Sequence, residues 1–227
     1  MTPTNGGGLS RLRGIFFDLD NTLIDRERAY EAYLRELSGR LPDPFADGAA
    51  LQAMRELDDR GMRDRTEFCR LVAERFPELG PTPARVWHDF AGGLTRAVTA
   101  APEVVALVQR LAQRYLLAVV TNGSSARQRE KLRRAGLSRL LTRVVISEEV
   151  GAEKPDVRIF GHALQQVGLE PGEVLFVGDD PARDVVGAHA AGMPCCWISH
   201  GRRFPQGLSP PSISVHHLLE LEPMLAG

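Results

Sequence analysis

Five short runs of almost uninterrupted apolar residues recur along the 227-residue chain, and each of them ends in polar residues. A strand with one face in water alternates apolar and polar positions, whereas a strand buried on both faces, as in a parallel sheet, is apolar throughout. The pattern therefore predicts buried parallel strands at Gly14–Asp18, Leu116–Thr121, Val144–Ser147, Val174–Gly178 and Cys195–Ser199.

Helical patterns separate the last four of these strands. They cover Ser124–Ala135, Asp156–Val167 and Pro181–Ala191, and a glycine directly follows each of them. A glycine just past the last turn is typical of a helix end. Because strands and helices alternate, the connections are expected to be right-handed βαβ units. We therefore predict an α/β fold with a Rossmann-like, doubly wound parallel sheet.

The first two strands are separated by about a hundred residues, far more than one crossover needs. Helical patterns fill most of this segment, at Arg26–Ser38, Ala49–Asp59, Arg65–Phe76, Pro83–Val98 and Pro102–Arg114. The last of these helices can serve as the crossover itself, so the others form an insertion. We predict an all-helical subdomain at residues 24–97, inserted into a core of residues 13–23 and 98–227, with a flexible glycine-rich tail at residues 1–12.

Composition places the chain among ordinary globular proteins, with 43% hydrophobic and 25% charged residues and a net charge of −1. This balance gives no basic field for nucleic acid, and the apolar runs are too short to cross a bilayer. We therefore expect neither nucleic acid nor a membrane as a partner. No apolar stripe stands out that would assign an oligomeric state.

Three cysteines, at positions 69, 195 and 196, are an odd number without a C-x-x-C pair, which favours a reducing compartment. The segment Met1–Ser10 lacks the apolar stretch of a signal peptide. A cytoplasmic location is therefore expected.

Polar side chains follow the predicted strands, at the edge of the sheet where ligands bind in open α/β folds. These residues are Asp18, Asp20 and Thr22; Thr121, Asn122 and Gly123; Gly151, Lys154 and Pro155; and Asp179, Asp180 and Asp184. The lysine is informative because only two of the 28 basic residues are lysines, the other being Lys131. We expect a cluster of carboxylates, a hydroxyl group and a lysine to face one crevice.

Several carboxylates this close together repel one another unless a counter-charge is present. Asp18 and Asp179 offer the hard oxygen ligands that Mg²⁺ prefers. Lys154, Thr121 and the backbone N–H groups around Asn122 are suited to hold phosphoryl oxygens. The cluster therefore predicts Mg²⁺-dependent phosphoryl transfer, a reaction that depends mainly on positioning and electrostatics.

Four segments resemble the ordered motifs of the haloacid dehalogenase (HAD) superfamily. They are Asp18-Leu19-Asp20-Asn21-Thr22, the strand ending at Thr121, Lys154-Pro155, and Gly178-Asp179 with Asp184. Each follows its own predicted strand, and the resemblance extends from about Arg13 to Ser199. The helical insertion directly after the first motif resembles the C1 cap of subfamily I, which implies a HAD core with a cap.

The resemblance implies a role for each matching carboxylate. Asp18 would be the nucleophile that forms an aspartyl-phosphate, and Asp20 would be the general acid and base. Asp18, Asp179 and the backbone carbonyl of Asp20 would bind Mg²⁺. Asp184 would orient the lysine or support the metal through water.

The phosphate-binding residues implied by the resemblance are Thr121, Asn122 and Lys154. The resemblance also implies that Lys154 is a catalytic residue, together with Asp18 and Asp20. An acid at position 20 suits a phosphatase or a phosphomutase, because the dehalogenases of the superfamily lack it. The segments D-L-D-N-T-L and T-N-G look most like nucleotidase-type and N-acylneuraminate-9-phosphatase-type members.

We therefore expect a phosphatase that hydrolyses a small soluble phosphorylated metabolite. A phosphomutase of the same superfamily is the first alternative, although Asn21 disfavours it because such enzymes more commonly have glycine there. A non-catalytic HAD-like binding module is the second alternative. All catalytic positions are filled, which speaks against it.

The insertion contains one segment with candidate substrate contacts. Gly61 separates two predicted helices and is surrounded by arginines, among them Arg63 and Arg65. In C1-capped relatives a glycine-bearing turn reads the leaving group, so these two arginines are candidate substrate residues. The alternative is a solvated loop with weak local ion pairs. Arg202 and Arg203, after the last predicted strand, are further candidate contacts for an anionic substrate.

Overall fold

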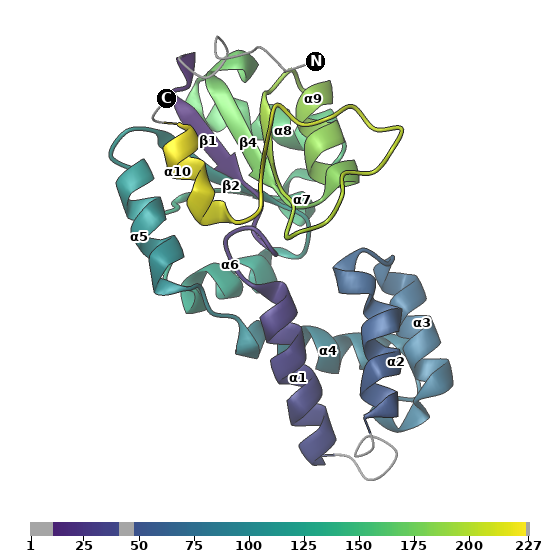
Figure 1. Ribbon diagram of the computed structural model, residues 1–227. Helices are drawn as coiled ribbons and strands as arrows, with labels where there is room; N and C mark the ends of the chain where they lie inside the picture. The colour runs from purple at the N-terminus through teal and green to yellow at the C-terminus, as the bar shows by residue number, and fades with distance from the viewer. Residues whose placement is uncertain (1–10, 41–47, 226–227) are drawn as a thin grey trace. The chain divides into compact units, whose positions relative to one another are not determined.

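The computed structural model describes residues 11–40 and 48–225, and it divides the chain into two compact units (Figure 1). One unit comprises Met1–Asp25 and Thr99–Gly227, and the other comprises Arg26–Val98. The predicted tail covers residues 1–12, and residues 1–10 of it lie outside the described residues.

The first unit is built on a parallel sheet that has six strands within the described residues, in the order β3-β2-β1-β4-β5-β6. Every neighbouring pair is parallel. The strands are β1 Gly14–Phe17, β2 Leu116–Thr121, β3 Arg143–Ile146, β4 Val174–Gly178, β5 Cys195–Ile198 and β6 Ile213–Val215. The predicted parallel sheet is confirmed, and β6 is an additional edge strand that the sequence analysis missed.

Helices cover both faces of this sheet, which makes it doubly wound (Figure 1). They are α5 Pro102–Leu111, α6 Ser125–Arg134, α7 Ser147–Val150, α8 Val157–Val167, α9 Val186–Ala190 and α10 Leu221–Met224, with a π-helical turn, η6 Pro181–Val185, before α9 and short 3₁₀ turns at η5 Pro171–Glu173 and η7 Leu218–Glu220. One face packs against α8 and α9, where Phe16, Phe160 and Phe176 belong to the same core cluster. Because side chains alternate along a strand, Phe17 and Val177 face the opposite side.

The order of the strands places a topological switch point between β1 and β4. From β1 the chain continues to β2 and β3 on one side, and it then returns to build β4, β5 and β6 on the other side. Loops leave the carboxyl ends of β1 and β4 in opposite directions at this point, so a crevice forms there in such sheets. Asp18 and Asp179 are the first residues after these two strands.

The second unit is entirely helical in its described part. It contains α1 Arg26–Arg40, α2 Ala49–Asp58, η3 Asp59–Gly61, α3 Arg65–Arg75, η4 Pro77–Leu79 and α4 Pro83–Ala97. Its core is aromatic: the rings of Tyr30, Tyr33 and Phe68 all lie within 6 Å of the ring of Phe90, centre to centre. Asp64 accepts hydrogen bonds from the first backbone N–H groups of α3 and thereby begins that helix.

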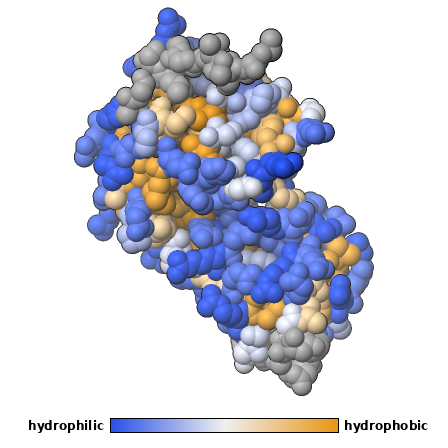
Figure 2. All heavy atoms as spheres, in the orientation of Figure 1, coloured by the Kyte–Doolittle hydropathy of each residue, from blue (hydrophilic) through white to orange (hydrophobic). Residues whose placement is uncertain are grey.

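Hydrophilic side chains dominate the face of the molecule in Figure 2, with hydrophobic areas interspersed among them. Within the described residues, no single helix is both long and apolar enough to cross a membrane, and only α4 and α5 counted together, as a bent pair, meet that criterion by length and composition.

Candidate active site

The loop after β1 carries the first two predicted catalytic carboxylates. Asp18 is buried, and its backbone N–H donates to the carbonyl of Val177 at 2.8 Å, which extends the β1–β4 pairing by one residue. The chain then turns sharply, with Asn21 in the left-handed region at φ 57°. The ring of His200 contacts the carbonyl oxygen of Asn21 at 2.7 Å. The turn brings the chain back so that Ile24 pairs with Asp20 in an isolated β-bridge.

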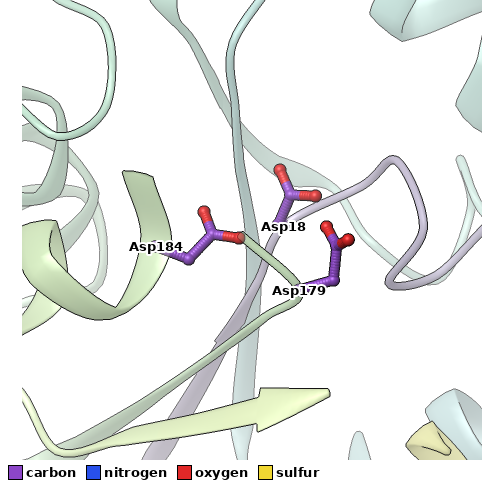
Figure 3. Close-up of side chains that lie close together, drawn as sticks. All are labelled: Asp18, Asp179 and Asp184. Atoms are coloured by element: carbon purple, nitrogen blue, oxygen red, sulfur yellow. The ribbon is translucent and has the colours of Figure 1, made fainter. Parts of the chain in front are cut away.

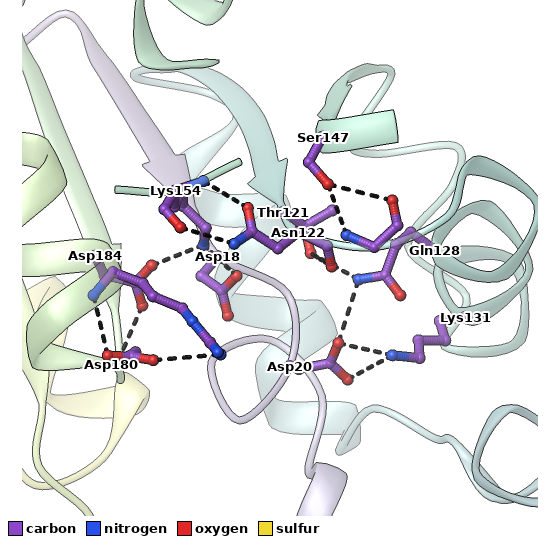
Figure 4. A network of polar contacts seen from close by, with 12 residues as sticks. Asp18, Asp20, Thr121, Asn122, Gln128, Lys131, Ser147, Lys154, Asp180 and Asp184 are labelled. Carbon is purple, nitrogen blue, oxygen red and sulfur yellow. Dashed lines mark hydrogen bonds and ion pairs between the residues drawn. The ribbon is translucent and has the colours of Figure 1, made fainter. Parts of the chain in front are cut away.

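Lys154 is 3% exposed, so its ammonium group is almost completely withdrawn from water. Its Nζ donates to Oδ1 of Asp18 at 2.6 Å and to Oδ1 of Asp184 at 2.7 Å (Figure 4). Burial disfavours the charged form, but the two adjacent carboxylates outweigh burial and raise the pKa of Lys154. The lysine is therefore a fixed positive charge between two carboxylates.

The loop after β4 supplies Asp179, Asp180 and Asp184, which have different partners. Asp180 accepts hydrogen bonds from the backbone N–H groups of residues 182 and 183, so it is the N-cap of the following turn. Asp184 accepts from the backbone N–H of Asp180 through Oδ2 at 3.0 Å. A Cβ at position 178 would collide with the carboxylate of Asp184, so only glycine allows this approach.

Asp18, Asp179 and Asp184 form a compact carboxylate cluster (Figure 3). One oxygen from each lies within 4.8 Å of the others, and all three residues are buried. Burial, together with the other two carboxylates, raises the pKa of Asp179 to about 8. Burial also raises the pKa of Asp18 to about 7, although Lys154 opposes this shift. Three buried hard-oxygen groups with unbalanced charge are a donor set that fits a divalent cation.

Arg202 supplies a second positive charge at the cluster. Its guanidinium donates to the backbone carbonyl of Asp179 at 2.6 Å and to Oδ2 of Asp179 at 3.0 Å. It also lies over the ring of Trp197, whose indole N–H donates to the same carbonyl at 3.0 Å. In the structure, the partner of Arg202, a candidate substrate contact, is therefore the carboxylate of Asp179.

Thr121 ends β2, as predicted, and Asn122 follows it, but the side chains of both have protein partners (Figure 4). Asn122 accepts from the backbone N–H of Lys154 at 2.8 Å and donates to its carbonyl at 3.0 Å. The hydroxyl oxygen of Thr121 accepts from Nε2 of Gln128 at 2.6 Å. Both side chains therefore also organise the site.

Two residues of α6 at this site were missed by the sequence analysis. Lys131 contacts both carboxylate oxygens of Asp20, at 2.8 and 2.7 Å, and Gln128 donates to Oδ2 of the same group at 3.2 Å. One signal existed in the sequence, because Lys131 is the other of the two lysines. Both lysines of this arginine-rich chain contact a predicted catalytic carboxylate.

The two candidate arginines of the insertion have partners within their own unit. Nε of Arg63 donates to the carbonyl of Leu57 at 2.6 Å, and its guanidinium pairs with Glu67 at 3.6 Å. The guanidinium of Arg65 lies 4.6 Å from the ring centre of Trp87. Their contact with substrate stays a prediction.

The sequence model of the family described as haloacid dehalogenase-like hydrolases matches residues 12–192. The chain belongs to this family. The match spans every site residue of the first unit named above except His200, Arg202 and Trp197, which follow it. The predicted resemblance is confirmed.

Relatives of this HAD-like hydrolase are named as a nucleotidase and as phosphatases. The chain is 36% identical over 149 residues to pyrimidine 5'-nucleotidase YjjG of Escherichia coli, an alignment that covers 65% of this chain and 66% of the nucleotidase, just under two thirds of its length. It is 29% identical to the N-acylneuraminate-9-phosphatase of Mus musculus, over 96% of this chain and 95% of that protein. The fold is similar to that of the HAD-hydrolase YfnB from Bacillus subtilis, with a TM-score of 0.75 at 24% identity, covering 95% and 99% of the two chains.

Proposed function

We propose that this HAD-like hydrolase is a magnesium-dependent phosphomonoesterase that acts on a small soluble phosphorylated metabolite. The observation that carries the proposal is the buried contact of Lys154 with Asp18 and Asp184, beside Asp179. This cluster would supply a nucleophilic carboxylate, a fixed cation and a donor set for a metal at one edge of the sheet. The nucleotidase and phosphatase names of the relatives support the same reaction.

In the first half of the reaction, Asp18 attacks phosphorus. Lys154 holds its Oδ1 at 2.6 Å, so Oδ2 is the oxygen proposed to attack. The bond between Oδ2 and phosphorus forms while the bond from phosphorus to the ester oxygen breaks. Asp20 gives its proton to that oxygen, and the product alcohol leaves. Lys154 and Thr121 donate to the phosphoryl oxygens.

In the second half, water hydrolyses the aspartyl-phosphate. Asp20, now a carboxylate, takes a proton from the water as its oxygen attacks phosphorus. The bond between phosphorus and Oδ2 of Asp18 breaks, which releases inorganic phosphate and restores the carboxylate. Asp20 thus ends the cycle protonated, as it began.

Asp18, Asp179 and the backbone carbonyl of Asp20 are the proposed ligands of Mg²⁺. The bound cation would neutralise charge on the phosphoryl oxygens and allow the dianion to approach the carboxylates. Asp184 already accepts from Lys154 and from the backbone of residue 180, which favours a role in orienting the lysine.

Residues 24–97 are proposed to act as a C1-type cap on the core of residues 13–23 and 98–227. The cap would exclude bulk water from the aspartyl-phosphate, and Arg63 and Arg65 would contact the leaving group. The three cysteines are free thiols, which supports a cytoplasmic location.

The test is phosphate release by the purified protein from a panel of phosphorylated metabolites, with Mg²⁺ and with EDTA. We expect release with Mg²⁺ and its loss with EDTA. A phosphomutase would instead return an isomeric phosphoester, and a binding module would release nothing. Either result would overturn the proposal.

Asp18→Asn tests the nucleophile, because asparagine is almost isosteric and keeps an oxygen for Lys154. We expect a loss of several orders of magnitude. A loss below about tenfold, roughly 1.4 kcal/mol of barrier, contradicts the covalent route. Asp180→Asn is the matched control, since asparagine is an equally good N-cap and the side chain of Asp180 contacts only the turn that it caps, including Arg183 at 3.6 Å.

A further inference from the structure

Two side chains of α6 join the predicted proton-transfer group to the predicted phosphate-binding hydroxyl. Gln128 and Lys131 lie one helical turn apart, so they share a face of the helix. We infer that both are positioning residues for the phosphatase reaction: Lys131 fixes the carboxylate of Asp20, and Gln128 fixes the hydroxyl of Thr121 as a hydrogen-bond donor. The inference rests on the proposed function.

Lys131 determines how the carboxylate of Asp20 is oriented. Its Nζ lies 2.8 Å from Oδ1 and 2.7 Å from Oδ2, so one ammonium group holds both oxygens. The lysine side chain is 12% exposed and the aspartate 25%, which protects the pair from much of the screening at open surfaces. Other charged residues of α6, such as Arg133, pair with neighbours on the helix surface.

Gln128 is 2% exposed and uses one amide nitrogen for two contacts. Nε2 donates to Oγ1 of Thr121 at 2.6 Å and to Oδ2 of Asp20 at 3.2 Å (Figure 4). Gly123 makes room for it, because a Cβ at that position would lie 3.1 Å from Cδ of the glutamine. The glycine of the T-N-G segment thus has a packing role toward Gln128.

The contact with Gln128 sets the polarity of Thr121. A hydroxyl group carries one hydrogen, and it can accept and donate at the same time. Because Oγ1 accepts from the glutamine, its hydrogen is left to donate. In the structure it points to the carbonyl of Asn122 at 3.5 Å, the long end of the hydrogen-bond range. A phosphoryl oxygen would be a stronger acceptor for the same hydrogen.

The contact with Lys131 matters when Asp20 gives up its proton. The O–H bond of Asp20 breaks, the new O–H bond forms on the leaving oxygen, and the electron pair stays on Asp20 as a carboxylate. Lys131 then donates to this carboxylate. The same carboxylate accepts the proton of water in the second half. Lys131 thus serves a step whose importance depends on how much the leaving oxygen needs a proton.

That dependence provides the test. We compare kcat/KM for phenyl phosphate and p-nitrophenyl phosphate, which are similar in size, while nitrophenolate leaves far more readily without a proton. Lys131→Met is expected to lower kcat/KM for phenyl phosphate by about tenfold or more. The loss of kcat/KM for p-nitrophenyl phosphate should be smaller by a factor of at least about three. Lys131→Arg should restore part of the loss. Lys131→Gln, which keeps a donor without the charge, repeats the test should the methionine variant not fold.

Gln128→Met tests the second contact. It keeps the size of the side chain and removes the amide donor. We expect it to lower kcat/KM for both substrates and to raise the inhibition constant of inorganic phosphate by about fivefold or more, because both substrates share the phosphoryl group that Thr121 would contact. Arg133→Met, on the exposed face of the same helix, is the control and should change none of these values.

The outcomes separate the two proposals. A wild-type protein that hydrolyses neither substrate nor any metabolite overturns the proposed function. If the wild-type protein is active but the Lys131 variants lose kcat/KM equally for both substrates, or lose none, the positioning role of Lys131 is overturned. An unchanged inhibition constant for phosphate in Gln128→Met overturns the role of Gln128.

Discussion

The side chain of Asn122 spans the backbone of Lys154. Its Oδ1 accepts from the lysine N–H at 2.8 Å and its Nδ2 donates to the lysine carbonyl at 3.0 Å, so both main-chain groups are held by one amide. The two residues belong to different loops, after β2 and after α7. Because the backbone of Lys154 is fixed, its ammonium group enters the carboxylate cluster from a defined position.

Asn122→Asp is expected to disturb this arrangement strongly, although aspartate and asparagine are almost the same size. It places a carboxylate oxygen where Nδ2 now donates, so two acceptors would face each other. Unmade buried hydrogen bonds cost about 1–3 kcal/mol each. We expect a lower melting temperature and a kcat reduced by about tenfold or more, measured by calorimetry and by phosphate release. Asn122→Ala, which removes both bonds without repulsion, should lie between this variant and the wild type. A wild-type melting temperature and a wild-type kcat in both variants would contradict the role of Asn122 in holding the backbone of Lys154.

The carboxylate cluster predicts a pH-dependent stability of the metal-free protein. The pKa of Asp179 is about 8 in the folded protein, raised from its ordinary value of 3.8 by burial and by Asp184 and Asp18. Between these two values, the folded state keeps a proton that the unfolded state has lost. The stabilising contribution is therefore complete below the lower value and is lost as pH rises through the higher one.

Asp179→Asn isolates this effect because asparagine does not titrate. In EDTA, the free energy of unfolding of the wild type should fall more between about pH 5 and about pH 8 than that of the variant, by at least about 1 kcal/mol. Urea denaturation of both proteins at the two pH values measures it. Added Mg²⁺ should stabilise the wild type at the higher pH and the variant much less. A wild type that gains stability relative to the variant as pH rises would contradict the sign.

The main sheet could be predicted from sequence because burial on both faces leaves runs such as Val174–Gly178 without polar positions. The edge strand Ile213–Val215 could not, since it has three residues, alternates with Ser214, and follows two prolines. The single helical turn at Ser147–Val150 is equally short. Length and periodicity carry the signal, and these two elements have little of either.

The site shows the same limit. Asp18 and Asp179 end their strands, so topology alone brings them together. Gln128 and Lys131 lie within a helix, and their spacing does not reveal which loop their face of the helix meets. The partner of Arg202 was equally unpredictable, because the loop after β5 has no regular geometry that a pattern could indicate.

Gly61 provides the last prediction, which concerns the stability of the second unit. Its φ is +81°, and it follows Asp59 and Arg60, which are also left-handed at 46° and 56°. A Cβ at Gly61 would lie 2.8 Å from Cζ and Nε of Arg26, which holds both carboxylate oxygens of buried Asp58 at 2.8 and 2.6 Å. Gly61→Ala therefore combines backbone strain with displacement of a buried ion pair, and we expect a loss of about 1–3 kcal/mol. Gly39→Ala, near the end of α1, where a Cβ meets nothing within 4 Å, is the matched control and should be neutral or stabilising by up to about 1 kcal/mol. Scanning calorimetry of both variants measures the difference, and equal melting temperatures would show that neither the strain nor the Arg26 contact limits the stability of this turn.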